Sequence, residues 1–483
     1  MVAASLLGLQ LGRWVLVLKE EDQDRFKPYH FVLIALLGIA TFYEGFDASM
    51  LTLASPDVRA ALGIGLDEWG TLYAVTRAGM VASFIFLMSA DRFGRRTLLV
   101  ITVGGFALAS VATAFVTTKV EFAACQTLAR LFLTAQYGLA IIIAGEELPA
   151  RYRGAGVTFL TAFATLGTVV MAKTSPFFLL LEGAPGNLAH DFALSLVEQT
   201  SSYFQIPFDG EHWRGLYLIG GLPLLLLPFL YFGIRETGRF KEVAANLESM
   251  SIKETLREQF AGAKALFQPR YLPSFLIVTL LWNCVHLVTA PSTAFWAIYV
   301  REEVGMTPAQ VGDVVMWAYI AGAIGLLVAG QLVDRVGRKF TCSICYVIAA
   351  FCIVGLFHAS TLFGQYFWHI TTVFFFNCAI GATNVYALEL FPTALRATGY
   401  GWTTNLFGRG AEVVTPILIS QLIPLLGISW GVSMMAVGPI LGALLVWKFA
   451  PETKGLSLEE IQEQLAAAAE ARKRNLDKGV FES

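Results

Sequence analysis

The sequence predicts an all-α polytopic membrane protein with twelve transmembrane helices in two six-helix halves. Three observations support this prediction: a composition poor in charge, twelve continuous apolar stretches, and loop motifs that occur once in each half. Hydrophobic residues make up 56% of the 483-residue chain and charged residues only 14%, against about 25% in an average soluble domain. So few charges could not cover the surfaces of soluble domains. The net charge of −2 gives no indication of a nucleic-acid partner.

Each apolar stretch is long enough for a helix to cross a bilayer, which takes about 20 residues. The stretches are continuous rather than alternating, which excludes the strands of a membrane β-barrel. The expected spans are residues 31–54, 67–90, 97–117, 120–143, 155–182, 214–234, 272–299, 309–333, 340–360, 364–388, 396–424 and 428–450.

Lys and Arg residues indicate the orientation of the spans, because they concentrate on the cytoplasmic side. Of the 34, four lie inside spans, and four lie in the loops that are outside if the N-terminus is cytoplasmic, namely Arg59, Lys119, Arg214 and Arg301, so the other 26 mark the opposite side. Both termini are therefore expected in the cytoplasm, in a plasma or inner membrane. The expected parts are an N-terminal segment 1–30, a first half 31–235, a central cytoplasmic loop 236–271, a second half 272–450 and a cytoplasmic tail 451–483.

Four segments outside the spans have helical character. Residues 1–28 form an amphipathic segment that is expected to lie on the membrane. A long outer loop, 183–212, contains a possible short helix over 192–202. Residues 251–267 have helical periodicity with mixed charge, which predicts an amphipathic surface helix. The tail 456–483 also has the pattern of one amphipathic helix.

The loops of the two halves repeat each other. D-R-F-G-R-R (91–96) follows span 2, and D-R-V-G-R-K (334–339) follows span 8. E-E-L-P-A-R-Y-R-G (146–154) follows span 4, and E-L-F-P-T-A-L-R-A-T-G (389–399) follows span 10. The glycines permit a tight turn, and the aspartates can pair with arginines or cap a helix. We expect these loops to latch neighbouring helices through Asp91, Arg92, Gly94, Arg95, Arg96, Glu146, Arg153, Asp334, Arg335, Gly337, Arg338, Glu389 and Arg396.

On these motifs the chain resembles the major facilitator superfamily across all twelve spans. E-T-G-R-F (236–240) and P-E-T-K-G (451–455) are similar to elements of its sugar-porter and organic-ion branches. Y-E-G-F-D (43–47) is similar to the D-G-[YF]-D element of aromatic-acid/proton symporters. The resemblance implies the major facilitator fold, a monomer, and alternating access by rocking of the two halves around a central site.

The chain departs from that pattern at two places. Leu87 stands where the family usually has a glycine before the loop aspartate, whereas Gly330 keeps the glycine in the second half. Span 7 lacks the paired glutamines of sugar porters and has Trp282, Asn283 and His286 instead. This difference argues against a hexose substrate.

Ionisable residues inside spans are costly and usually face a cavity or a partner. Glu44 and Asp47 lie three apart on one face of span 1, and either could carry protons. Asp47 and Arg130 of span 4 resemble the coupling pair of proton-driven sugar porters. The alternative for Arg130 is a structural ion pair with Glu146 or Glu147.

The remaining intramembrane charges suggest an anionic substrate. In span 11, Asn405, Arg409 and Glu412 share a helical face by their spacing. Arg409 could be neutralised by Glu412 or could bind a substrate carboxylate through its planar fork. The resemblance associates a span-11 arginine with anionic substrates. The expected substrate-binding set is Arg409, Asn405, Glu412, Arg77, Lys173, Tyr43, Asn283, His286 and Trp282.

The sequence therefore predicts a secondary transporter, a proton symporter for a small organic anion such as an aromatic carboxylate. The alternatives are a proton-coupled sugar or polyol porter, an efflux antiporter, and a sensor that binds without transport. No Ser-His-Asp order, metal-ligand spacing or P-loop is present, so we expect neither an enzyme nor a cofactor or metal. Cys342 and Cys345 form a C-x-x-C without a second pair, which is typical of packing cysteines.

Overall fold

The computed structural model describes residues 26–179, 195, 198–200, 202–203, 212–237, 263–392, 395–456, 460–461 and 463–465. More than half of each of the predicted segments 1–28, 192–202, 251–267 and 456–483 lies outside these residues. The helices are α2 (Pro28–Leu53), α3 (Ser55–Leu62), α4 (Leu66–Ala82), α5 (Phe84–Phe93), α6 (Arg95–Thr113), α7 (Lys119–Glu147), α8 (Arg153–Leu179), α10 (Trp213–Ile219), α11 (Leu227–Gly233), α14 (Leu272–Glu302), α15 (Pro308–Arg335), α16 (Arg338–His358), α17 (Leu362–Glu389), α18 (Arg396–Tyr400), α19 (Gly410–Ser433) and α20 (Val437–Phe449).

The twelve predicted spans are confirmed. Within the described residues, eleven helical stretches are long and apolar enough to cross a membrane. The last of them, Thr398–Phe449, has 52 residues, which is enough for two crossings. Gly427 interrupts it with φ 74° and ψ 168°, and this is the break that the sequence predicts between spans 11 and 12.

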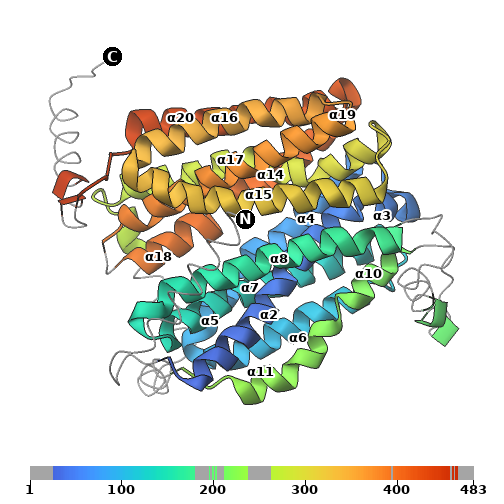
Figure 1. The fold of residues 1–483 in the computed structure, drawn as a ribbon, viewed down its shortest axis with the longest axis horizontal. Helices are drawn as coiled ribbons and strands as arrows, with labels where there is room; N and C mark the ends of the chain where they lie inside the picture. The colour runs from blue at the N-terminus through green and yellow to red at the C-terminus, as the bar shows by residue number, and fades with distance from the viewer. Residues whose placement is uncertain are drawn as a thin grey trace, which may run out of the picture.

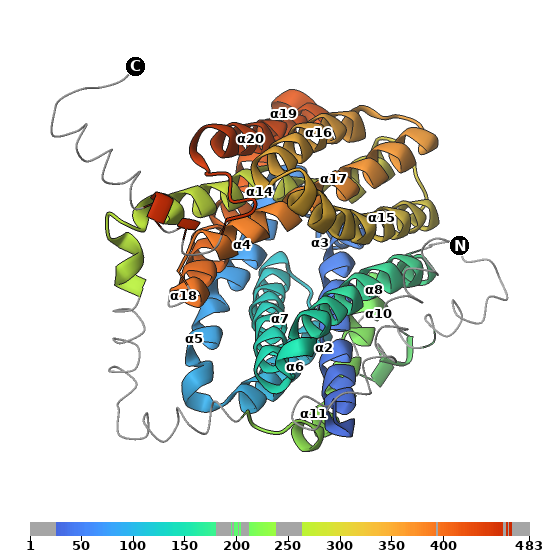
Figure 2. The same ribbon diagram turned by 60° about the vertical axis from the view of Figure 1, so that its left-hand side comes forward.

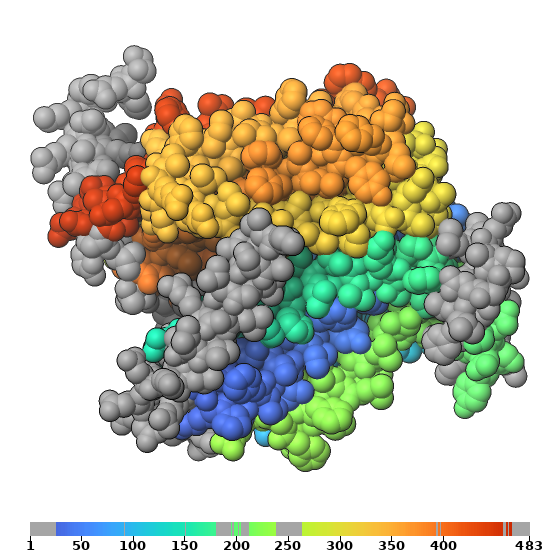
Figure 3. Space-filling view, in the orientation of Figure 1, coloured from blue at the N-terminus to red at the C-terminus, as the bar shows by residue number. Residues whose placement is uncertain are grey.

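The two halves repeat the same helix pairings (Figure 1). The first and fifth spans pack together in each half, as α2 with α8 and as α14 with α19. The second and fourth spans pair as α4 with α7 and as α15 with α17. Between the halves, α8 lies against α15 and α4 lies against α19. Figure 3 shows the first of these contacts at the surface, where the yellow α15 meets the green α8.

The halves are joined at one end of the bundle, which we call the closed end; it holds α3 and residues 303–307. One buried apolar cluster there takes side chains from both halves, including Trp69, Tyr73, Phe295 and Ile419. At the opposite end, the latch end with loops 91–96 and 334–339, each half has a buried cluster of its own. In Figure 2 the second-half helices lie above the first-half helices, with α3 between the two bundles.

The first-half loop is organised around a carboxylate from the end of that half. Gly94 has φ 88°, a region that favours glycine, and α6 starts directly after it. Glu236 Oε1 accepts from the backbone N–H groups of Arg95 and Arg96 at 2.7 and 3.2 Å. The Arg95 guanidinium pairs with Glu146 at 3.2 Å. The E-T-G-R element therefore caps α6, and the two first-half motifs meet.

The second-half loop repeats this arrangement. Gly337 has φ 118° and precedes α16. The Glu452 carboxylate accepts from the backbone N–H groups of Arg338 and Lys339, both at 3.0 Å. Arg338 pairs with Glu389 at 2.9 Å. The P-E-T-K-G element thus has the capping role of its first-half counterpart, with a carboxylate at the positive end of a helix.

The other predicted latch residues lie around these two centres. Asp334 pairs with Arg338 at 3.6 Å, so of its two predicted roles the structure shows the arginine pair and not the helix cap. Arg153 Nε donates to a backbone carbonyl at 3.0 Å. The side chain of Asp91 lies outside the described residues. The remaining members lie at the ends of α5, α15 and α18: Arg92, Arg335 and Arg396.

Gly337→Ala is expected to destabilise the protein by about 1–3 kcal/mol, because an L side chain is strained at this φ. A Cβ there would also lie 2.7 Å from Glu452 Oε2. Gly330→Ala is the control, since a Cβ at that position meets no atom within 4 Å, and it should be neutral or stabilising by up to about 1 kcal/mol. Thermal unfolding in detergent measures both. Equal effects of the two substitutions would contradict the turn requirement.

Candidate functional site

A buried charge cluster lies where the two halves meet, with Glu412 of α19 at its centre. Glu412 Oε1 pairs with Arg77 of α4 at 3.0 Å, and its Oε2 pairs with Arg409 at 2.7 Å. The three side chains are 7%, 11% and 19% exposed, respectively. Two guanidinium groups thus share one carboxylate, and this triad carries an excess of one positive charge. The Arg409–Glu412 pair predicted from sequence is present.

Close helix packing brings these charges together across the interface. A Cβ at Gly70 would lie 1.9 Å from the backbone oxygen of Pro416, so α4 can approach α19 only with glycine there. Gly70 N donates to Ser420 Oγ at 2.7 Å. Arg77 lies two turns further along α4, and Glu412 lies one turn before Pro416 on α19. Small residues therefore set the approach, as is common between membrane helices.

Tyr73 supports Arg77 from the same helix. The Arg77 guanidinium donates to Tyr73 Oη and lies 4.7 Å from the centroid of the Tyr73 ring. Tyr73 Oη also contacts Thr293 Oγ1 of α14 at 2.9 Å, which links the cluster to a third helix. The sequence analysis did not select Tyr73. Its spacing of four residues before Arg77 is the signal that could have identified it.

His286 and Trp282 of α14 complete the cluster. His286 Nδ1 lies 3.8 Å from Glu412 Oε2. The Trp282 ring stacks on His286, with ring centroids 5.8 Å apart and an interplanar angle of 24°. Two predicted residues of span 7 therefore stand beside the shared carboxylate, and one of them presents an aromatic face.

Span 11 is not a continuous α-helix at the cluster, so one prediction is wrong. The sequence places Asn405 and Arg409 on one helical face, but residues Gly401–Leu406 form a π-helix, η5. Arg409 is the cap residue that precedes α19, with φ −93° and ψ 5°. The four-residue spacing therefore does not align Asn405 with Arg409. A π-helical turn has a different residue period, and apolar patterning does not indicate it.

Asn283 bridges the break in span 11. Its Nδ2 donates to the backbone oxygen of Phe407 at 2.9 Å, and its Oδ1 accepts from the backbone N–H of Ala411 at 2.8 Å. Both atoms of one amide thus hold the backbone on either side of Arg409. Asn283 therefore positions Arg409 through its backbone contacts and contributes no charge to the cluster.

A second buried pair lies within the first half. Asp47 of α2 and Arg130 of α7 are 3.3 Å apart, with side chains 0% and 2% exposed. Arg130 also donates to the backbone oxygen of Asp47 at 3.0 Å. Of the three partners considered for Arg130, namely Asp47, Glu146 and Glu147, the structure shows Asp47. Glu146 is bound to Arg95 instead. Glu44 lies one turn before Asp47 and is partly exposed.

Two predicted substrate-binding residues have other surroundings. The Tyr43 ring packs edge-on against Phe42 and Phe46, with centroids 5.4 and 5.9 Å apart. Lys173 of α8 pairs with Asp313 of α15, with side chains 51% and 39% exposed. Lys173 therefore belongs to the contact between the halves and is not brought to the charge cluster.

Two ion pairs join the halves at the closed end. Asp57 of α3 pairs with Arg301 near the end of α14, and Arg59 pairs with Glu302 at 2.6 Å. Each helix contributes one acid and one base, so the two ion pairs run in opposite directions between α3 and α14. The sequence analysis counted Arg59 and Arg301 only as charges in outer loops, because nothing in their spacing identifies a partner about 240 residues away.

Asp47→Asn is expected to destabilise the protein by about 3–5 kcal/mol, because Arg130 would remain buried without a counter-charge. The double variant Asp47→Asn/Arg130→Met should recover most of that loss. Unfolding in detergent, followed by tryptophan fluorescence, measures both variants.

The control for that pair is Glu68→Gln, which breaks an exposed pair with Lys119 and should change stability by less than about 1 kcal/mol. Additive losses in the double variant would show that the two buried groups are not energetically coupled.

Comparisons with known proteins agree with this architecture. The sequence profile of the Major Facilitator Superfamily matches residues 37–410 and, in a second match, residues 287–481. A gallate transporter of Pseudomonas putida is 26% identical over 414 residues, which cover 81% of this chain and 85% of that protein. A niacin transporter of Acinetobacter baylyi is 24% identical over 456 residues, covering 90% and 96%.

The fold is also that of solved transporters. The crystal structure of a D-xylose-proton symporter superposes with a TM-score of 0.67 at 18% sequence identity, covering 89% of this chain and 100% of that one. The profile matches run through both halves, and the helices repeat as the family fold requires. The chain therefore belongs to the Major Facilitator Superfamily and is a multi-pass membrane transporter.

Proposed function

We propose that the protein is a proton-coupled symporter of a small organic anion, an aromatic or similar carboxylate. The observation that carries the proposal is the cluster in which Arg77 and Arg409 share the single carboxylate of Glu412. A planar guanidinium binds a carboxylate through two parallel hydrogen bonds. The triad has one positive charge to spare, so an incoming anion is favoured over a neutral sugar or a cation.

The relatives support the same substrate class. Gallate and niacin, named in the two relatives described above, are both aromatic carboxylates in their ionised forms. An aromatic ring beside the arginines would meet Trp282, which already stacks on His286. Offset stacking of this kind adds about 0.5–1.5 kcal/mol to the burial of an aromatic ring. Asn283 supports this site by holding the backbone on either side of Arg409.

Alternating access follows from the uneven contact between the halves. The shared apolar cluster and the ion pairs Asp57–Arg301 and Arg59–Glu302 close one end. The latch end carries the excess of Lys and Arg, so it faces the cytoplasm by the positive-inside rule, as do both termini. On this assignment the conformation is closed to the outside. Lys173 and Asp313 belong to the closing contacts.

Coupling arises from competition for the two arginines. A substrate carboxylate that accepts hydrogen bonds from Arg77 and Arg409 displaces Glu412, because those donors are the ones that Glu412 holds now. A displaced carboxylate without a counter-charge in a buried site favours its protonated form. The buried pair Asp47–Arg130 forms a second acid–base group for proton movement within the first half, with the partly exposed Glu44 one turn away.

The direct test is uptake into proteoliposomes with an imposed pH gradient, using labelled nicotinate, gallate and xylose as probes. We expect accumulation of a carboxylate and none of xylose, with accumulation abolished when the gradient is collapsed. Carboxylate uptake that does not depend on the pH gradient would contradict proton coupling. Uptake of xylose alone would instead favour a sugar or polyol porter, and loss of carboxylate from loaded vesicles against inward proton flow would favour an antiporter.

Arg77→Gln and Arg409→Gln should each weaken binding of the transported carboxylate roughly tenfold or more, because each removes a charge-assisted hydrogen bond. Lys173→Gln is the matched control, since it removes a cation that is paired elsewhere, and it should leave affinity within about twofold. Isothermal titration of the purified variants measures the affinities. If Lys173→Gln lowered the affinity as much as the arginine variants do, the assignment of the carboxylate site to Arg77 and Arg409 would be contradicted.

Glu412→Gln separates binding from coupling. The neutral amide competes less for the two arginines, so carboxylate affinity should be kept or increased, and substrate exchange across the vesicle membrane should continue. Accumulation driven by the pH gradient should be lost, because the displaced group can no longer take up a proton. Retained gradient-driven accumulation would exclude Glu412 from coupling and leave the Asp47 group to perform it.

A further inference from the structure

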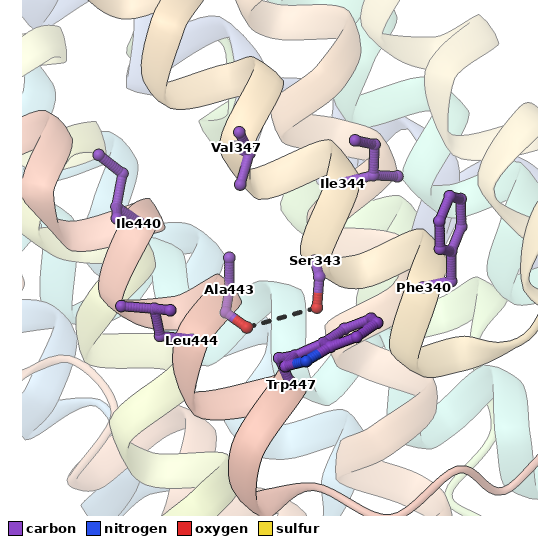
Figure 4. A pocket seen from close by; sticks show the side chains of 8 residues that line it. All are labelled: Phe340, Ser343, Ile344, Val347, Ile440, Ala443, Leu444 and Trp447. Carbon is purple, nitrogen blue, oxygen red and sulfur yellow. Dashed lines mark hydrogen bonds between the residues drawn. The ribbon is translucent and has the colours of Figure 1, made fainter.

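A groove opens on the outer surface of the second half, between α16 and α20 and away from the charge cluster (Figure 4). It encloses about 270 Å³. Each helix contributes four residues at the spacing i, i+3, i+4 and i+7, which is one helical face. The lining residues are Phe340, Ser343, Ile344 and Val347 of α16 and Ile440, Ala443, Leu444 and Trp447 of α20.

Small residues form the floor of this groove and large apolar ones form its walls. Ser343 Oγ donates to the backbone oxygen of Ala443 at 3.3 Å, the contact drawn in Figure 4. The wall residues Phe340, Leu444 and Trp447 are 52%, 59% and 60% exposed. In a membrane transporter this face points toward lipid, so the occupant must be apolar along the length of the groove.

The equivalent place in the first half is filled by the chain itself. Counting from the two turn glycines and the two capping glutamates, Val347 corresponds to Gly104 of α6, and Ala443 corresponds to Leu227 of α11. The Leu227 side chain lies against Gly104, 3.4 Å from where a Cβ would stand. A large residue thus faces a small one in each half: Leu227 reaches Gly104 in the first half, whereas Ala443 and Val347 line the groove in the second.

The cations at the latch end of the two places also differ. In the first half, Arg96 lies over the Tyr231 ring at 4.9 Å and donates to the Tyr231 backbone oxygen at 3.5 Å. In the second half, the Lys339 ammonium lies 5.7 Å from the Trp447 ring centroid, at the mouth of the groove. Glu452 accepts from the Lys339 backbone N–H at 3.0 Å, and among the described residues no carboxylate forms an ion pair with the Lys339 side chain.

We propose that this groove binds one acyl chain of an anionic phospholipid, whose phosphate pairs with Lys339. The seven-residue length of each lining face spans about 10 Å at 1.5 Å per residue, which matches the first part of an acyl chain below its headgroup. The latch end carries the excess of basic residues, and anionic lipids bind basic positions near the membrane surface. Lys448, exposed beside Trp447, adds a second positive charge near the mouth.

Native mass spectrometry of the full-length protein tests this site, with phosphatidylglycerol and phosphatidylcholine of identical acyl chains as probes. The wild type should retain one phosphatidylglycerol more tightly than phosphatidylcholine. Ala443→Leu introduces the first-half residue and should remove the bound lipid of either kind. Lys339→Gln should lower the preference for phosphatidylglycerol about fivefold, which is the effect of one basic residue near the surface.

Arg96→Gln is the matched control and should leave the preference unchanged. Equal retention of the two lipids by the wild type, or unchanged phosphatidylglycerol binding in Ala443→Leu, would overturn the proposal. A dimer that Ala443→Leu converts to monomers would also overturn it, because a second copy of the chain would then occupy the groove. Lys339 is a surface residue, so its variant keeps the test decisive even where Ala443→Leu disturbs folding.

Discussion

The burial of three charges at the joint between the halves is the constraint on which the rest of the structure depends. An ion taken out of water costs several kcal/mol unless partners replace its hydration. Glu412 meets this requirement for Arg77 and Arg409 at once, but Arg77 belongs to the other half. The pairing therefore exists only while α4 and α19 are in close contact. The same contact closes one end of the bundle, so the site and the closed conformation depend on each other.

The duplicated latch loops explain how the halves can move without coming apart. In each half, a carboxylate from the segment after the last span caps the third helix, as Glu236 does for α6 and Glu452 for α16. This contact ties the sixth span to the third within one half, and the arginine–glutamate pairs add the fourth. The described contacts between halves concentrate at the closed end. Two internally tied bodies joined at one end are what a rocking motion needs.

Divergence between the halves is as informative as their repetition. The capping carboxylates and turn glycines occupy equivalent positions, but the lipid-facing surfaces do not match. Leu227 packs against Gly104 at a place where Ala443 lines a groove. Both Arg96 and Lys339 lie near an aromatic ring, but Arg96 also donates to a backbone oxygen. A buried turn tolerates few residue types, whereas a surface that faces lipid only has to remain apolar.

The sequence by itself determined the number of spans, their division into two halves and the residues of the repeated loops. These properties depend on local apolar length and on motif spacing, which are visible along one chain. It also indicated that Asp47 and Arg130 could pair, and that Glu412 could neutralise Arg409. Only the tertiary structure decided that Arg77 joins Glu412 from the other half, that Lys173 pairs with Asp313, and that a π-helix displaces Asn405. Pairings between residues far apart in the chain depend on how the helices pack. Packing in turn depends on side-chain volume at close contacts such as Gly70 with Pro416, and such contacts leave no periodic signal in the sequence.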